Sequence, residues 1–367
     1  MKVAFRVDAS LVMGNGHVMR CLTLAACLRE SGAECLFICR EHQGNLIRFI
    51  CDKGFPVSSL PVEDVGNFSE NGYQEWLGTT QERDADICKK VLEVFSPDWL
   101  VVDHYGLDAC WELSVSSFFK QLLVIDDLAN RAHACNVLLD QNLGRSACDY
   151  KALVPNDCML LVGPLYALLR PEFSKLRGFS LQRRSQALVK RLLITMGGVD
   201  RLNATGQVIN ALRESALPED CHISIVMGIN APWLEQVKVE AERLSWKVEV
   251  LVSVEDMARQ MANSDLVIGA AGSTSWERCC LGVPSILVVL AENQLMVAKS
   301  LQDCGAVRLL DIRENFEGSL KLELQSLLAN MESVRELSIN SAAITDGRGV
   351  MKIAGLMSNY SHAGGEL

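Results

Sequence analysis

The strongest constraint on the fold is an alternation of short apolar, β-branched runs with longer amphipathic stretches, which occurs twice along the 367-residue chain. Such alternation indicates a mostly parallel sheet with helices on both faces. The expected strands are Lys2–Val7, Glu34–Cys39, Trp99–Asp103, Gln121–Ile125 and Val137–Asp140, then Arg191–Met196, His222–Met227, Lys247–Leu251, Asp265–Gly269 and Ser285–Leu290. We therefore predict an α/β protein made of two doubly wound, Rossmann-type domains.

The chain length fits two domains of about 150 residues each. We place the first domain at residues 1–175 and the second at 190–345, with residues 346–367 as a final helix that packs back on the first domain. The stretch Arg170–Lys190 is rich in Arg, Lys, Ser and Gln and has little apolar periodicity, so we interpret it as a linker or a domain crossover. Ligands of such sheets bind beyond the carboxyl ends of the strands. Two facing domains would then form an interdomain cleft lined by the loops that follow the strands.

Composition excludes several classes of protein. Lys plus Arg total 35 and Asp plus Glu total 45, and this net charge of −10 argues against general binding of nucleic acid or anionic membranes. No apolar run approaches 18 residues, and Arg6 and Asp8 interrupt the first one, so we expect neither a membrane span nor a signal peptide. We expect a cytoplasmic monomer whose 14 cysteines are mostly buried, reduced thiols.

The loop after the first strand carries the clearest candidate for acid–base chemistry. Gly14 and Gly16 permit close approach of a ligand to the backbone, and His17 opens the following helix. An anion can bind at such a helix start, and an imidazole there can accept a proton near neutral pH. The alternative is a polar residue that faces solvent from the first helical turn.

Polar residues also follow two later strands, at Asp103-His104-Tyr105 and at Asp126-Asp127, with His133 just beyond. Carboxylates and imidazoles can bind a metal ion, but their spacing matches no compact ligand motif. Capping of loops and helices is the alternative. We expect no metal and no cofactor.

The second half offers two glycine-bearing loops that suit a phosphate. Gly197 and Gly198 follow a strand and precede a helix, which fits either a phosphate cradle or a plain tight turn. A further strand runs into Gly272, Ser273 and Thr274, with Glu277 one turn into the next helix. Small residues leave room for a nucleotide there. Glu277 can accept hydrogen bonds from ribose hydroxyls or, alternatively, complete a capping box. Asn293 and Gln294 follow the next strand, so they are expected at the same edge of the sheet, beyond the carboxyl ends of the strands.

Taken in order, these segments resemble one known family. FRVDAS, GNGHVMRCLTLA, VVDHYG, VIDDLANRAH, LLDQN, GPLYALLRPEF, LLITMGGVD, GAAGSTSWERCCLGVPSILV, AENQ and TDGRGVMKIAGLM are similar to segments of PseG-type UDP-sugar hydrolases of pseudaminic acid biosynthesis. These hydrolases cleave UDP-2,4-diacetamido-2,4,6-trideoxy-β-L-altropyranose. The resemblance covers nearly the whole chain.

The resemblance implies a fold and a set of roles. It implies a GT-B fold like that of MurG, and metal-independent hydrolysis at the anomeric carbon with His17 as the base that activates water. Gly272, Ser273 and Thr274 would meet the pyrophosphate and Glu277 the ribose. The backbone near Val254 would meet uracil, Asn293 or Gln294 the sugar or phosphate, and Tyr105 and Asn142 the sugar. The alternatives are a GT-B glycosyltransferase, a hydrolysing UDP-sugar 2-epimerase and a binding module without turnover.

Overall fold

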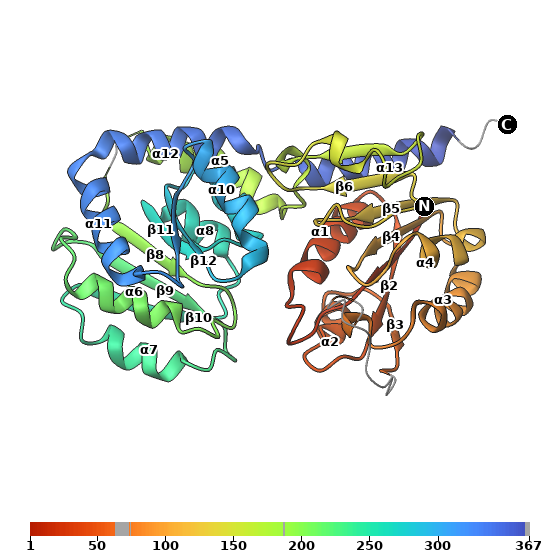
Figure 1. Ribbon diagram of the computed structural model, residues 1–367, viewed down its shortest axis with the longest axis horizontal. Coiled ribbons are helices and arrows are strands. Elements are labelled where there is room, and N and C mark those ends of the chain that lie inside the picture. The colour runs from red at the N-terminus through yellow and green to blue at the C-terminus, as the bar shows by residue number, and fades with distance from the viewer. Residues whose placement is uncertain (63–72, 74, 186–187, 364–367) are drawn as a thin grey trace. The chain divides into compact units, whose positions relative to one another are not determined.

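The computed structural model describes residues 1–62, 73, 75–185 and 188–363, with only the backbone described for residues 293 and 361–363. The chain divides into two compact units, which we describe separately. The first contains Met1–Leu169 and Arg348–Leu367, and the second contains Arg170–Gly347 (Figure 1).

The first unit is a seven-stranded parallel sheet with the order β3-β2-β1-β4-β5-β6-β7. Its strands are β1 (Lys2–Val7), β2 (Glu34–Arg40), β3 (Val57–Leu60), β4 (Trp99–Asp103), β5 (Gln121–Ile125), β6 (Val137–Asp140) and β7 (Met159–Val162). The strand order reverses between β1 and β4, which places a topological switch point at their carboxyl ends.

Helices cover both faces of this sheet. Helices α1 (Gly16–Glu30), α2 (Ile47–Asp52) and α13 (Gly349–Ala363) pack on one face, and α3 (Gln81–Phe95) and α4 (Ala109–Ser114) pack on the other. The final helix α13 lies along α1, and the Trp99 indole N–H donates to the carbonyl of Met357 within it, at 3.2 Å. The last turns of the chain are therefore part of the first unit.

The second unit is a six-stranded parallel sheet with the order β10-β9-β8-β11-β12-β13. Its strands are β8 (Arg191–Thr195), β9 (His222–Met227), β10 (Lys247–Val252), β11 (Leu266–Ala270), β12 (Ser285–Val289) and β13 (Arg308–Asp311). The order reverses between β8 and β11, so both units repeat the same winding. The prediction of two doubly wound α/β domains is confirmed.

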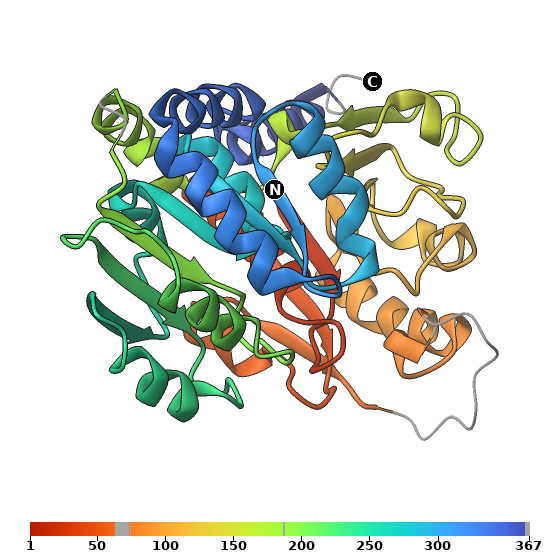
Figure 2. The ribbon, with the colours of Figure 1, turned by 60° about the vertical axis from the view of Figure 1, so that its left-hand side comes forward.

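The core on one face of this second sheet includes residues of α6 (Ala204–Arg213), α7 (Leu234–Ala241) and α11 (Phe316–Ala329). Figure 2 shows α11 (blue) crossing the sheet beside α6. The remaining helices are α5 (Pro171–Arg183), α8 (Met257–Asn263), α9 (Thr274–Leu281), α10 (Leu295–Asp303) and α12 (Met331–Ile344). Helix α5 packs on α8 and α9, and α12 packs on α9.

The linker alternative for Arg170–Lys190 was wrong, because α5 occupies Pro171–Arg183, but the division between the two units does fall at the start of this stretch, after Leu169. Two arginines that bond to backbone carbonyls, the partly buried Arg177 and the buried Arg184 at the end of α5, hid its helical pattern. Arg177 donates to the carbonyl oxygen of Ala342 at 2.7 Å, and Arg184 donates to that of Met261 at 3.0 Å. A guanidinium can donate hydrogen bonds to carbonyl groups of the packed interior. In a sequence pattern, however, arginine counts as a polar residue, so the apolar periodicity of the helix is not visible. Strands β3, β7 and β13 were also missing from the predicted set.

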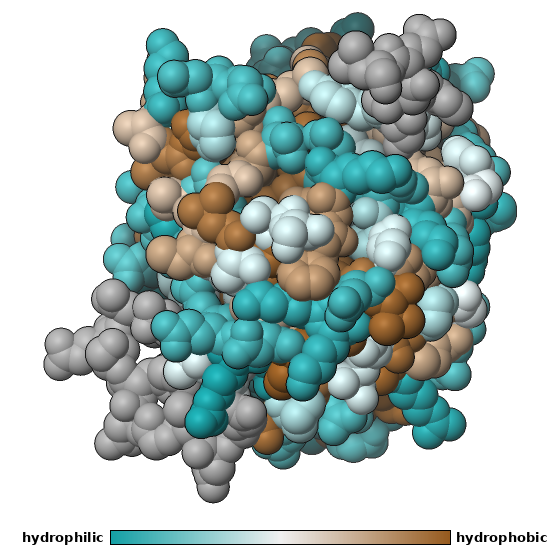
Figure 3. Space-filling model, turned by 90° about the vertical axis from the view of Figure 1, so that its right-hand side faces the viewer, coloured by the Kyte–Doolittle hydropathy of each residue, from teal (hydrophilic) through white to brown (hydrophobic). Residues whose placement is uncertain are grey.

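Among the described residues, no helix combines the length and apolar character needed to cross a membrane. In Figure 3, hydrophilic residues are interspersed with the apolar ones over the face turned to the viewer. All 14 cysteines are free; eight are buried, two are partly buried and four are exposed. Most of the cysteines are therefore buried, as expected, and the four exposed ones are the exceptions.

Candidate active site

The loop between β1 and α1 presents His17 in the first helical turn. The amide of Gly14 donates to the Ser10 carbonyl at 2.9 Å, and Gly14 has φ +75°, a conformation that favours glycine. The Ser10 hydroxyl accepts a further hydrogen bond from the amide of Met13 at 3.0 Å. The loop is therefore a tight turn that leads directly into α1. As a result, His17 lies at the carboxyl end of β1.

His17 is held by a buried carboxylate on the neighbouring strand. Its Nδ1 lies 2.6 Å from Oδ1 of Asp103, the last residue of β4. The strands β1 and β4 are paired directly, with Val7 opposite Asp103, so the switch point brings the two residues together. A carboxylate at Nδ1 keeps the proton there and leaves the lone pair of Nε2 available as a base. Among the described residues, no hydrogen bond or ion pair involves Nε2 of His17.

Arg20 keeps Asp103 ionised and fixed in place. Its Nε lies 2.6 Å from Oδ2 of Asp103 and its Nη2 lies 2.7 Å from Oδ1, a bidentate pair. Burial by itself would raise the pKa of Asp103, but the charge of Arg20 and the hydrogen bonds from Arg20 and His17 outweigh it and lower that pKa. His17 and Arg20 are three residues apart on α1, so they share one face of the helix.

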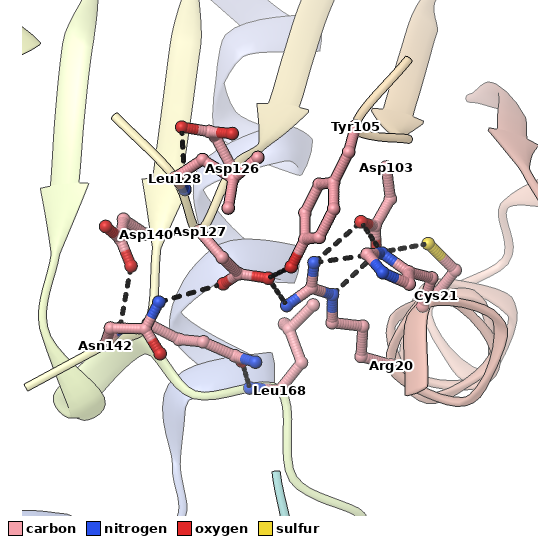
Figure 4. Close-up of polar contacts among 12 residues, drawn as sticks. Arg20, Cys21, Asp103, Tyr105, Asp126, Asp127, Leu128, Asp140, Asn142 and Leu168 are labelled. Atoms are coloured by element: carbon pink, nitrogen blue, oxygen red, sulfur yellow. Dashed lines mark hydrogen bonds and ion pairs between the residues drawn. The ribbon is translucent and has the colours of Figure 1, made fainter. Parts of the chain in front are cut away.

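A second carboxylate extends this network along the carboxyl ends of β4, β5 and β6 (Figure 4). Asp127 lies 2.8 Å from Nη1 of Arg20 and accepts hydrogen bonds from the Tyr105 hydroxyl at 2.8 Å and from the Asn142 amide at 3.1 Å. The structure thus places Tyr105 and Asn142 in one network with Arg20, and the Tyr105 ring meets His17 edge-on with 4.7 Å between centroids.

The candidate metal ligands of this region do not come together. Among the residues that the structure describes, no group of three or more His, Cys, Asp or Glu side chains is arranged to hold a metal ion. His133 pairs with Glu112 at 2.7 Å, and Asp126 pairs with Arg131 at 2.6 Å. Nδ1 of His104 accepts the amide proton of Gly106, and its Nε2 lies 3.3 Å from Asp8. His133, Asp126 and His104 thus have separate partners and do not face one common position.

In the second unit, the helix after Gly197 and Gly198 has its first amides already occupied. Asp200 accepts hydrogen bonds from the amides of Ala204 and Thr205, at 2.8 and 2.9 Å, and Asn203 accepts one from Gly206 at 3.2 Å. The first turn of α6 is therefore poorly suited to a phosphate. The space around Gly197 and Gly198 themselves is open, because a Cβ added at either residue would meet no atom within 4 Å.

The start of α9 is different. Among the described residues, no acceptor is found for the amides of Gly272, Ser273 and Thr274, and the side chain of Ser273 makes no capping hydrogen bond. An added Cβ at Gly272 would meet nothing within 4 Å. Three consecutive free amides at the positive end of a helix dipole, beside open space, form a good binding site for an anion.

Glu277, one turn into α9, is partly buried, and no hydrogen bond or ion pair involves it among the described residues. The capping-box alternative for this residue is therefore wrong. Burial raises its pKa to about 7, although Arg170 and Arg278 act in the opposite direction. A carboxylate without a partner beside an anion site is free to accept hydrogen bonds from a ligand.

The other predicted positions lie in two further loops of the same unit, after β10 and after β12. Val254 follows β10 and is partly exposed, next to Ser253, which has φ +51°. Gln294 follows β12, and its side-chain oxygen accepts the amide proton of Leu290 at 2.9 Å, so it supports this loop. The side chain of Asn293 lies outside the described residues.

Comparisons of sequence show what the chain is similar to. Residues 192–350 match the glycosyltransferase family 28 C-terminal domain. The chain is 27% identical over 80% of its length to an uncharacterized protein of Methanocaldococcus jannaschii, and it spans 56% of that protein's length. It is 28% identical over 83% of its length to the UDP-2,4-diacetamido-2,4,6-trideoxy-beta-L-altropyranose hydrolase of Campylobacter jejuni, of which it covers 97%.

Among solved structures, MurG of Acinetobacter baumannii matches with a TM-score of 0.73 at 16% identity, covering 98% of this chain and 99% of MurG. The chain has the GT-B fold. The family 28 match falls on the unit that carries the free amides of α9 and Glu277, whereas His17, Asp103 and Arg20 lie outside the matched residues.

Proposed function

We propose that this protein hydrolyses a UDP-activated sugar at the anomeric C–O bond, with His17 as the general base. The observation that carries this proposal is the pairing of His17 with Asp103, which leaves Nε2 of the imidazole free of protein partners among the described residues. The similarity to the Campylobacter jejuni hydrolase supports it and points to a UDP-2,4-diacetamido-2,4,6-trideoxyhexose as the substrate.

In this proposal each unit has its own task. The free amides of Gly272, Ser273 and Thr274 bind the pyrophosphate, Glu277 accepts hydrogen bonds from the ribose, and the backbone near Val254 meets the uracil. Gly197, Gly198, Gln294 and Asn293 complete the loops around the phosphate and sugar, and Tyr105 and Asn142 orient the sugar beside His17. Fixed amide donors stabilise the charge that develops on UDP as it leaves.

The proposed reaction needs water as its only co-substrate. Nε2 of His17 accepts a proton from water while the oxygen of that water bonds to the anomeric carbon. The bond between that carbon and the UDP oxygen breaks, and its electron pair leaves with UDP. Asp103 and Arg20 do not touch the reacting atoms; they hold His17 in the tautomer and orientation that the step requires.

A glycosyltransferase is the competing function, because the family 28 match is compatible with it. The test is the release of UDP from a panel of UDP-sugars in the presence of EDTA and without any acceptor. We expect release from the diacetamido-trideoxy sugar with no solvent deuterium at C2 of the product. Release only after an acceptor is added would identify a transferase, and deuterium at C2 in D₂O would identify an epimerase.

The anion site at α9 predicts a specific effect of a small substitution. Gly272→Ala adds one methyl group where the free protein has open space, so the fold should be unaffected. If phosphate occupies that space, the dissociation constant of UDP should rise about tenfold, which corresponds to about 1.4 kcal/mol. Titration calorimetry measures it. Gly178→Ala in α5, also in open space, is the matched control and should leave UDP affinity unchanged. Equal affinities of both variants would contradict the α9 site.

Glu277 predicts a pH dependence of UDP binding. Its pKa of about 7 in the free protein means that near pH 7 about half of the molecules carry a proton there. Hydrogen bonds from ribose favour the ionised form, so binding lowers the pKa and releases protons. UDP affinity should therefore rise as the pH increases from about 5 to about 8, then level off. Calorimetry in two buffers of different ionisation enthalpy should detect this release in the wild type and none in Glu277→Gln.

A further inference from the structure

An aromatic cluster lies beside His17, in addition to the polar network. Trp76 belongs to a short 3₁₀ segment, Glu75–Leu77, and its ring stacks on that of Tyr105 with 5.5 Å between centroids and 23° between planes. The Tyr73 ring meets both edge-on, at 5.0 Å from Trp76 and 5.2 Å from Tyr105. Trp76 also lies edge-on to His17 at 6.5 Å.

Tyr105 provides a fixed support for Trp76. Its hydroxyl donates to Asp127, which Arg20 and Asn142 also hold (Figure 4). Burial, and then the charge of Asp127, raise the pKa of Tyr105, so the phenol stays a neutral donor. With its hydroxyl bound in this way, the Tyr105 ring is held against both His17 and Trp76.

Trp76 differs from most of the other tryptophans in the contacts of its indole N–H. Four of the other five donate their indole N–H to a protein acceptor: Trp99, Trp111, Trp233 and Trp246. Among the described residues, no acceptor is found for the indole N–H of Trp76, and its side chain is partly exposed. The Trp76 ring is held by stacking and is partly exposed, so its face can contact C–H groups of a ligand. Its N–H can donate to a hydrogen-bond acceptor of the same ligand.

We propose that Trp76, supported by Tyr105, forms an aromatic wall that contacts the C–H face and methyl groups of the sugar and makes the site selective for deoxy, N-acetylated sugars. This inference rests on the proposed function, since it assigns the sugar to the His17 side. A hydroxyl placed against the ring faces would lose its hydrogen bonds to water without replacement, whereas a methyl group gains contact there. Differences of one such group in an apolar site change specificity by about 10–200-fold.

The first test is kinetic and uses Trp76→Ala and Trp76→Phe. Trp76→Ala should raise KM for the UDP-diacetamido-trideoxy sugar at least about tenfold with little change in kcat, and should reduce its preference over UDP-N-acetylglucosamine by a similar factor. Trp76→Phe should restore most of the affinity. The dissociation constant of UDP should not change, and Trp246→Phe, packed against the core of the second unit, is the control. An unchanged KM, or an equal loss of UDP affinity, would overturn the inference.

The second test needs no turnover and so separates this inference from the proposed hydrolysis. In saturation-transfer NMR with the His17→Ala protein, irradiation of aromatic protons should reach the methyl protons of the bound UDP-sugar, and the added change Trp76→Ala should abolish that transfer. Loss of transfer supports the wall even if the wild type releases no UDP. Two results would refute the aromatic wall even if the wild type is an active hydrolase. One is transfer that persists in the protein with Trp76→Ala, and the other is an absence of transfer in the protein that retains Trp76.

Discussion

His17→Ala is expected to lower kcat for UDP release by at least about two orders of magnitude, because a positioned general base contributes about 10²–10⁴-fold. Binding of UDP should be nearly unchanged, since the free amides of α9 and Glu277 belong to a different unit from His17. The fold should tolerate the change, because Asp103 keeps both hydrogen bonds from Arg20. Rapid-quench measurement of UDP release, with calorimetry for UDP affinity, checks both parts.

His17→Gln is the companion variant. Glutamine retains a hydrogen-bonding side chain of similar length but cannot accept the proton of water, so its kcat should fall as far as that of the alanine variant. If either protein turned over within about threefold of the wild type, His17 would not be the base. A parallel loss of UDP affinity and of thermal stability would instead indicate a general folding defect.

The parts of this protein that depend on local pattern were predictable from its sequence. The strands β1, β4, β5 and β6 have the expected bounds, because buried parallel strands are short apolar runs between turn residues. The loop that carries His17 could also be found, since two glycines before a histidine at a helix start form a local signal.

The partners of His17 could not be found in the same way. Asp103 is 86 positions away along the chain and becomes its neighbour only because β4 pairs with β1. Strand order is a property of the whole sheet, so no local pattern contains it. Trp76 follows a stretch without recognisable periodicity, and nothing in the sequence indicates that its indole stacks on Tyr105. The spacing of His17 and Arg20 on one helix face was the one available signal for Arg20.

Hydrogen bonds of side chains to the backbone were also invisible in the sequence. Two glycine-bearing loops precede helices in the second unit, and both looked suitable for a phosphate. Asp200 occupies the first amides of α6, whereas no side chain among the described residues occupies those of α9. The difference depends on the side-chain orientations of Asp200 and Asn203, and it supports the proposal that a pyrophosphate binds at Gly272–Thr274.

Asp103→Asn is expected to lower kcat by about 10²–10⁴-fold while the position of His17 changes little. The reason is that an amide cannot both hold the ring proton on Nδ1 and supply a negative charge there. An amide nitrogen facing Nδ1 would donate to it, which moves the ring proton to Nε2 and removes the lone pair that accepts the proton of water. An amide oxygen facing Nδ1 would preserve the tautomer, but its NH₂ group would then face Nε of Arg20, which is itself a donor. In both orientations the negative charge that stabilises the imidazolium formed during the step is lost.

Removing the negative charge of Asp103 also lowers the stability of the fold. The kcat of Asp103→Asn therefore needs to be compared with that of a control variant that is destabilised to a similar degree. Asp126→Asn is suitable, because Asp126 is a buried carboxylate at the end of the next strand, paired with Arg131 instead of Arg20. Both variants should unfold at lower denaturant concentration than the wild type. Only Asp103→Asn should lose kcat, with UDP affinity retained, and ¹⁵N NMR of the histidine ring should show its proton moving at least in part from Nδ1 to Nε2. A kcat for Asp103→Asn no lower than that of Asp126→Asn would mean that Asp103 stabilises the fold without positioning the base.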